Sequence, residues 1–199
     1  MKKIVGVVLC LLLAVCLFAG CSGGNKIENA VNTMASEDFS FSEKLDVPLS
    51  LLNLSEEEVQ SISKFTASPI TEDVTEYIWE FAEDREIVLQ TMNGEVKTVW
   101  YRYTDFDLSD DEKQELTTEF AQAVDTLSGK YIQDDITIND VSGASVDQLA
   151  QTLVGEDYNC HVTFHEKEDD SSFFIMIFRN SDSYTGLDSL SYCLNSLEF

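Results

Sequence analysis

Hydrophobic and polar residues alternate along several segments of the chain with the period of two that is typical of strands with one buried face. The clearest signal is a hairpin, because segments 86–92 and 95–103 flank the dipeptide Asn93-Gly94, which favours a two-residue turn. Pairing the last residue of the first segment with the first residue of the second places one apolar set on a single face: Ile87, Leu89, Val96 and Trp100. We therefore expect this face of the hairpin to be buried.

Three more segments are expected to be strands. Residues 77–81 precede the hairpin, and residues 158–167 and 173–179 form a second hairpin. Residues 173–178 are apolar at every position, which is typical of a central strand that is covered on both faces.

Helix starts are predicted from capping boxes, in which a serine hydroxyl accepts a hydrogen bond from the backbone N–H three residues later. Three segments have this pattern, at residues 55–58, 109–112 and 145–148. The second opens the most regular amphipathic segment, which we expect to end at Gly129. A fourth helix is expected from about Thr185, with one apolar stripe: Leu187, Leu190, Leu194 and Leu197.

These elements predict an α+β fold, in which an antiparallel sheet carries its helices on one face and forms a two-layer sandwich. The order is a helix, three strands and a helix, followed by a helix, two strands and a helix. This order looks like a diverged tandem repeat. We expect one domain over residues 48–199, with possible repeat halves at 48–130 and 131–199.

The N-terminus has the organisation of a signal peptide, because Lys2 and Lys3 precede an apolar stretch over residues 4–18. This stretch is short for a transmembrane helix, which needs about 20 residues to cross the hydrocarbon core. We therefore expect the remainder of the chain to be exported and to fold outside the cytoplasm.

The sequence Leu17-Phe18-Ala19-Gly20-Cys21 resembles the lipobox of bacterial lipoproteins, although Phe18 stands where that family usually has leucine. The resemblance implies that a diacylglyceryl group is attached to Cys21 and that residues 1–20 are removed. The lipid would then hold the protein on the extracytoplasmic face of the cell membrane, with residues 21–47 as a flexible tether. The alternative is an ordinary secretory signal peptide followed by a chance cysteine.

The net charge of the chain restricts the classes of partner that it is expected to bind. The 199-residue chain has 12 basic and 37 acidic residues and a formal net charge of −25, and loss of Lys2 and Lys3 with the signal peptide makes that charge more negative by two. Nucleic acids and anionic lipid headgroups bind clustered lysines and arginines, so we expect no nucleic-acid partner. A cationic ligand or another envelope protein fits this charge, and the alternative is that the charge only maintains solubility.

Residues 54–103 weakly resemble the small α+β lipoproteins of the BamE type and the tandem fold of the β-lactamase inhibitor protein. The resemblance depends on the capped helix start at 54–59, the strand around Trp79 and the turn at 93–96, and it extends more faintly over residues 145–179. The Gly-x-Pro that commonly follows the first helix in the BamE group is absent. The resemblance implies a non-catalytic role in assembly or binding.

The candidate metal and catalytic motifs lack the spacing or the partner residues that their chemistry requires. His161 and His165 lie on a predicted strand, where four residues span about 13 Å, which is too far for one zinc ion. Residues 105–109 resemble the start of an EF-hand loop, but Asp110 stands where glycine is required. Residues 61–64 match Ser-x-x-Lys without the other motifs of that enzyme class. We expect no catalytic residues, no metal site and no cofactor.

The two cysteines of the C-terminal half can be interpreted in two ways. Cys160 is expected on the inward face of its strand, and Cys193 lies on the buried stripe of the predicted fourth helix. Export permits a disulfide between them. Alternatively, both are buried free thiols that behave as small hydrophobic side chains.

Tyr101, Arg102 and Tyr103 are the residues expected to form a binding surface, because tyrosine and arginine are enriched at binding hot spots. The hairpin register places Tyr101 opposite Glu86, on the face away from Trp100. The alternative is that the tyrosines lie under a packed helix.

The sequence thus predicts a lipid-anchored, extracytoplasmic domain without catalytic activity that binds another component of the cell envelope. Two alternatives stay open. One is an accessory subunit of an envelope assembly machine, and the other is an envelope hydrolase that uses acidic residues.

Replacing Cys21 with serine removes the thiol that the lipid requires. We expect the Cys21→Ser protein to leave the membrane fraction and to move from the detergent phase to the aqueous phase in Triton X-114 partitioning. Unchanged partitioning would contradict the predicted anchor.

Overall fold

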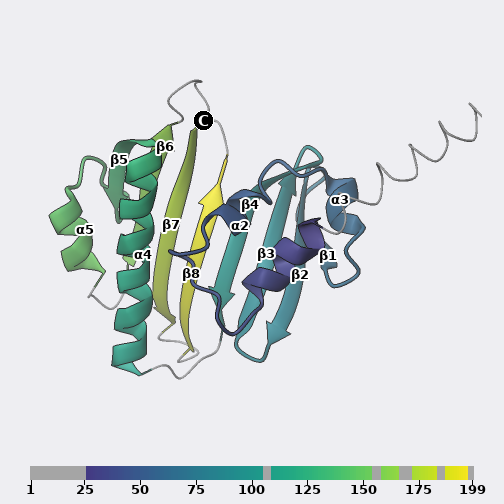
Figure 1. Cartoon of the computed structure of the whole chain (residues 1–199), viewed down its shortest axis with the longest axis horizontal. Helices are drawn as coiled ribbons and strands as arrows, with labels where there is room; N and C mark the ends of the chain where they lie inside the picture. The colour runs from purple at the N-terminus through teal and green to yellow at the C-terminus, as the bar shows by residue number, and fades with distance from the viewer. Residues whose placement is uncertain (1–25, 105–108, 154–157, 166–171, 183–186, 197–199) are drawn as a thin grey trace, which may run out of the picture.

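The computed structural model of the chain describes residues 26–104, 109–153, 158–165, 172–182 and 187–196 (Figure 1). These residues form one antiparallel sheet of eight strands, together with one long helix and several short ones. The mixed α/β character and the antiparallel sheet predicted from the sequence are therefore confirmed.

The first half of the sheet follows an unlabelled helix over residues 26–34. Its elements are α2 (Asp46–Leu49), α3 (Glu56–Gln60), β1 (Thr66–Pro69), β2 (Val74–Ala82), β3 (Arg85–Met92) and β4 (Glu95–Tyr103). The second half consists of α4 (Asp110–Lys130), β5 (Ile132–Ile138), α5 (Val146–Thr152), β6 (Tyr158–His165), β7 (Ser172–Asp182) and β8 (Leu187–Asn195). The strand order across the sheet is β1-β2-β3-β4-β8-β7-β6-β5.

The two central strands, β4 and β8, come from different halves of the chain. They pair antiparallel, with Val99 opposite Leu194 and Tyr101 opposite Tyr192. Each central strand is the inner end of a meander, β4 to β1 on one side and β8 to β5 on the other. The backbone hydrogen bonds of this one pairing therefore join the two halves of the sheet.

All three predicted capping boxes are present. Ser55, Ser109 and Ser145 each accept a hydrogen bond from the N–H three residues later, and the side chain of that later residue accepts one from the serine N–H. Each box satisfies two backbone donors that a helix start would otherwise leave unpaired. The capping chemistry therefore predicts the starts of α3, α4 and α5 correctly.

The predicted end of α4 is corrected. The helix continues past Gly129 to Lys130, and the N–H of Tyr131 still donates to the carbonyl of Leu127 at 2.8 Å. Strand β5 begins directly afterwards, so the chain leaves the helix without the left-handed glycine turn that we expected.

The predicted fourth helix is wrong, because residues 187–195 form strand β8. Leucines three and four residues apart suggested a helix, but Tyr192 and Leu194 also lie two residues apart, and both are buried. Strands β4 and β7 pair with β8 on its two sides. Tertiary pairing that satisfies the backbone on both sides here overrides a local helical pattern.

The hairpin turn between β3 and β4 is formed as predicted. Asn93 and Gly94 both have positive φ angles, of 53° and 81°, as a two-residue turn of this kind requires. Met92 lies opposite Glu95, so the register next to the turn is also confirmed.

The register shifts by one residue at Lys97, which has no partner in β3. One extra residue reverses the face of every residue that follows it. Trp100 therefore lies on the face opposite the core, contrary to the prediction. Tyr101 lies opposite Ile87 and not opposite Glu86.

The main core lies between one face of the sheet and the helices. The helix over residues 26–34 and α4 both lie over this face in Figure 1. Their buried side chains join one cluster with inward side chains of the strands, including Ile27, Val31, Met34, Phe120, Val124, Leu127, Leu89 and Ile175. Phe41 stacks on Tyr192 of a central strand, with ring centroids 4.7 Å apart. The segment before residue 48 therefore covers the middle of the sheet.

These contacts correct the predicted tether over residues 21–47 and the predicted domain start at residue 48. The described part of the chain is already helical at Lys26, and residues 26–47 contribute several side chains to the core: Ile27, Val31, Met34, Phe41 and Leu45. Apolar residues at helical spacing in this segment were the signal that the sequence offered. Only residues 22–25 separate Cys21 from Lys26.

Candidate functional site

The three residues of the predicted binding surface do not lie on one surface. Tyr101 is only 2% exposed, and its ring centroid lies 5.2 Å from that of Phe39 in the core. Arg102 is the next residue of β4 and therefore faces the other side of the sheet. Tyr103 returns to the core side, with its ring 5.4 Å from that of Tyr101. The predicted contiguous surface is wrong.

Arg102 is held on the other face of the sheet by acidic and aromatic neighbours. Its Nη1 lies 3.1 Å from Glu86 Oε1, and its Nη2 lies 4.0 Å from Glu76 Oε1. The guanidinium carbon lies 4.7 Å from the centre of the Trp100 ring. These contacts occupy the guanidinium with groups of its own chain.

A groove of about 710 Å³ lies on the core side, between residues 37–43, α4 and Tyr103. Five glutamates line it: Glu37, Glu43, Glu112, Glu115 and Glu119. Neutral polar side chains complete the lining: Ser40, Ser42, Gln114, Thr118 and Gln122. The three glutamates on α4 are three and four residues apart, so one face of the helix presents them all.

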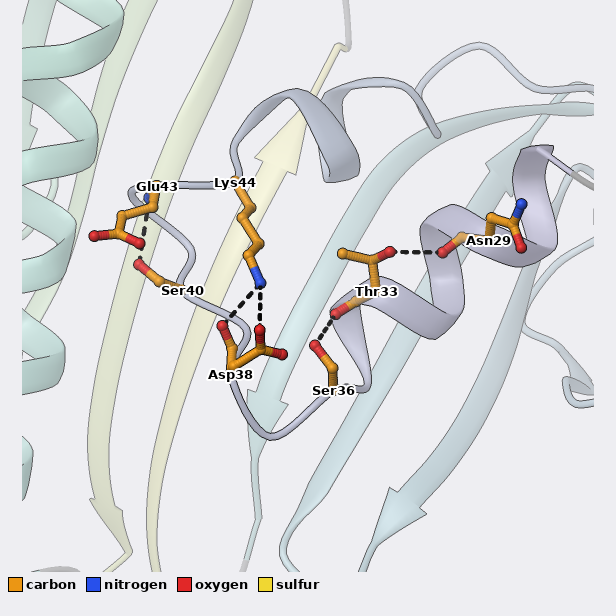
Figure 2. Close-up of polar contacts among 7 residues, drawn as sticks. All are labelled: Asn29, Thr33, Ser36, Asp38, Ser40, Glu43 and Lys44. Carbon is orange, nitrogen blue, oxygen red and sulfur yellow. Dashed lines mark hydrogen bonds and ion pairs between the residues drawn. The ribbon is translucent and has the colours of Figure 1, made fainter.

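Hydrogen bonds within residues 37–44 shape one wall of this groove (Figure 2). Lys44 Nζ donates to the Asp38 carbonyl at 2.9 Å and to the Asp38 carboxylate at 3.3 Å. The N–H of Glu43 donates to the Ser40 hydroxyl at 3.3 Å. The hydrogen bond from Ser36 and the contact with Lys44 lower the pKa of Asp38. The wall is thus a loop closed by its own polar contacts.

The same wall is attached to α4, because the N–H of Ser42 donates to Glu119 Oε1 at 3.3 Å. The hydrogen bond from the Ser109 hydroxyl lowers the pKa of Glu112, so this carboxylate is ionised at neutral pH. Burial raises the pKa of Tyr103 well above its usual range. The Tyr103 hydroxyl therefore stays protonated, and Tyr103 adds a neutral side chain to the lining of the groove.

Carboxylates, hydroxyls and side-chain amides in one groove are acceptors suited to ammonium and guanidinium groups. Sequence reasoning missed this groove because residues 37–43 were assigned to the tether. The visible signal was the spacing of Glu112, Glu115 and Glu119 on one helix face. That signal alone did not identify the second wall.

His161 and His165 lie on β6, so the predicted strand is confirmed. The His161 ring lies 5.7 Å from that of Phe174, and His165 Nε2 lies 3.1 Å from Asp134 Oδ2. Within the described ranges, no group of three His, Cys, Asp or Glu side chains could hold a metal ion. Residues 105–108 of the EF-hand-like segment lie outside the described residues.

Cys160 and Cys193 do not form the disulfide that the sequence left open, because both are free and buried. Cys160 lies opposite Ile177, which belongs to the main core, whereas Cys193 lies opposite Trp100 on the other face. The sheet itself separates the two sulfur atoms. Burial raises the pKa of Cys160 to about 11 and also raises that of Cys193. The alternative of two buried thiols is the one that the structure shows.

Comparisons with known proteins add no relative. No protein-family model matches the chain, and no curated protein or solved structure is significantly similar to it. No helix in the described part of the chain combines the length and the apolar character needed to cross a membrane.

The arrangement of the cysteines predicts the behaviour of the thiols. We expect a reducing agent to leave the melting temperature unchanged, because Cys160 and Cys193 lie on opposite faces of the sheet. Both thiols should react with a maleimide only after denaturation, since thiolate formation is suppressed in the buried sites. Mass spectrometry that detects a Cys160–Cys193 cross-link in unreduced protein would contradict this arrangement.

Proposed function

We propose that this protein is a lipid-anchored, extracytoplasmic binding protein without catalytic activity, and that it binds a cationic ligand in its acidic groove. The main observation that supports this proposal is that five glutamates from two separate segments line one groove. The net charge of −25 supports the same ligand class, because a strongly anionic protein attracts cations over distances longer than a contact.

The ligand class follows from the groups that line the groove. Lys44 bonds with Asp38, and no lysine or arginine is among the residues that line the groove. A primary amine or a guanidinium can therefore approach the glutamates without competing with a cation of the same groove. Hydrogen bonds to ionised groups are stronger than neutral ones, which favours lysine-rich or arginine-rich peptides and polyamines.

The proposed anchor holds the folded part of the chain close to the membrane. Cys21 is five residues before Lys26, the first described residue, and five residues span at most about 18 Å even when fully extended. A lipid on Cys21 would therefore hold the folded part near the bilayer surface. We infer that the ligand is met at that surface, as a segment of another envelope component.

The fold itself is proposed to be a two-layer sandwich that arose from a diverged repeat, in which α4 belongs to the second half and not, as in the halves 48–130 and 131–199, to the first. Each half has a helix that packs on the sheet, residues 26–34 or α4, followed by a meander of four strands. The strand order is symmetric about the β4–β8 pair. In this proposal the groove lies where the N-terminal segment of the first half meets the helix of the second.

A pair of isosteric substitutions that removes two negative charges tests the groove. We expect Glu115→Gln with Glu119→Gln to weaken the binding of a lysine-rich decapeptide about tenfold, because two partly exposed charge contacts together contribute roughly 1 to 2 kcal/mol. Isothermal titration calorimetry at 0.15 M salt measures this.

The matched control is Glu72→Gln with Asp73→Asn, which removes the same charge from an exposed turn between β1 and β2. This variant should bind the peptide as the unaltered protein does. Equal weakening by both variants would show a general charge effect, and absence of binding by the unaltered protein would refute the groove as a cation site.

A further inference from the structure

A second pocket lies at the edge of the sheet that β1 forms (Figure 1). Its volume is about 320 Å³, and six residues from the start of β1 and the middle of β2 line it: Lys64, Thr66, Ser68, Ile78, Trp79 and Glu80. The lining combines one cation, two hydroxyls and two apolar side chains with a single carboxylate. None of these residues lines the acidic groove, so the two sites are separate.

Strand β1 leaves part of the outer edge of β2 uncovered. It begins at Thr66, which lies opposite Ile78, whereas β2 continues for four residues beyond Ile78. The residues just before β1 form a turn and do not extend the strand, since the Phe65 N–H donates back to the Ile62 carbonyl at 3.4 Å. Residues 79–82 of β2 therefore have no strand partner on the β1 side.

The alternation of hydrogen bonds along this edge shows which backbone groups point outward. The Ile70 N–H donates to the Val74 carbonyl at 2.9 Å, and the next pair, which contains Pro69, is of the other kind because proline has no N–H. The two kinds of pair alternate in an antiparallel ladder, so the N–H and C=O of Ile78 point toward β1. Those of Glu80, two residues later, point to the same side, beyond the start of β1. Within the described residues, the Glu80 backbone thus offers a donor and an acceptor beside the pocket.

Lys64 supplies the positive charge of the pocket. Its Nζ donates to the side-chain oxygen of Asn32 and lies 4.4 Å from the centre of the Trp79 ring. These contacts hold the ammonium group in place without neutralising it, since no carboxylate in the described part of the chain forms an ion pair with Lys64. Five other cations do have carboxylate partners: Lys44, Arg85, Lys97, Arg102 and Lys130. A lysine ammonium has three N–H donors, so donors remain for an anionic group.

We propose that this pocket binds the carboxyl-terminal end of an extended peptide, which pairs with Glu80 as a short added strand and places its terminal carboxylate near Lys64. Extended peptides add to sheet edges through main-chain hydrogen bonds. The occupant is a chain end, because a longer segment would run into β1, which occupies the rest of this edge. Charge selects the carboxyl end. A peptide antiparallel to β2 directs its carboxylate toward the start of β1 and Lys64, whereas the reverse direction would bring an ammonium group there.

The rest of the lining fits a peptide end. The hydroxyls of Thr66 and Ser68 can donate to a carboxylate. Ile78 and Trp79 are half-buried and give the last side chain of the peptide an apolar contact. The Glu80 side chain is exposed, so water and salt screen its repulsion of the carboxylate.

Two peptides that differ only in their last group test this proposal. One is an N-acetylated tetrapeptide of alternating threonine and valine with a free carboxylate, and the other is its carboxyl-terminal amide. We expect the carboxylate form to bind the full chain in detergent micelles with a dissociation constant of about 1 mM or lower, and the amide about tenfold more weakly, because a charge-assisted contact is lost. An NMR titration measures both affinities, and the amide signals of Thr66 and Glu80 should shift.

Lys64→Met removes the charge and keeps an unbranched side chain beside Trp79. It should weaken the carboxylate peptide about tenfold and leave the affinity for the amide unchanged. Lys97→Met is the matched control, because Lys97 lies on β4, outside the pocket, and it should bind both peptides as the unaltered chain does. Equal affinity of the unaltered chain for the two peptides would overturn the proposal whether or not the Lys64 variant folds. Absence of binding at about 1 mM, or shifts confined to the acidic groove, would also overturn it.

Discussion

The antiparallel pairing of β4 with β8 is the contact on which the rest of the structure depends. Without it, each half would be a four-stranded meander with an open edge, and a single helix would have to cover each one. The pair brings Tyr101 of the first half next to Tyr192 of the second. The Phe41 ring stacks on the Tyr192 ring, so the N-terminal segment packs over the β4–β8 pair. One pairing thereby builds both a continuous core and the wall of the groove.

The proposed groove follows from the way in which segments of the two halves meet on one face of this sheet. On the face that the helices cover, the segment over residues 37–43 and α4 meet near the β4–β8 pair. Their glutamates converge because both segments pack on the same apolar face of the sheet. On the opposite face, alternation along the strands and the extra residue at Lys97 place Trp100 beside Cys193.

Features that depend only on neighbouring residues could be predicted from the sequence, whereas the register between distant strands could not. The capping serines at 55, 109 and 145 and the Asn93-Gly94 turn depend only on neighbouring residues, and all are present. The unpaired Lys97 has no such local signal, so the predicted face of Trp100 and the predicted exposure of Tyr101 were wrong. Strand β8 was assigned as a helix because its pairing partners lie far away in the sequence. The groove was missed for the same reason, since Ser42 and Glu119, which join its two walls, are 77 residues apart.

The central claim is that the chain folds as one cooperative unit joined through β4 and β8. Native-state hydrogen exchange measured residue by residue tests it most directly, because amides that open only in global unfolding report the stability of their own unit. The account predicts one shared free energy of opening for the most protected amides of β3, β4, β7 and β8. Two distinct values, one for β3 and β4 and another for β7 and β8, would contradict it.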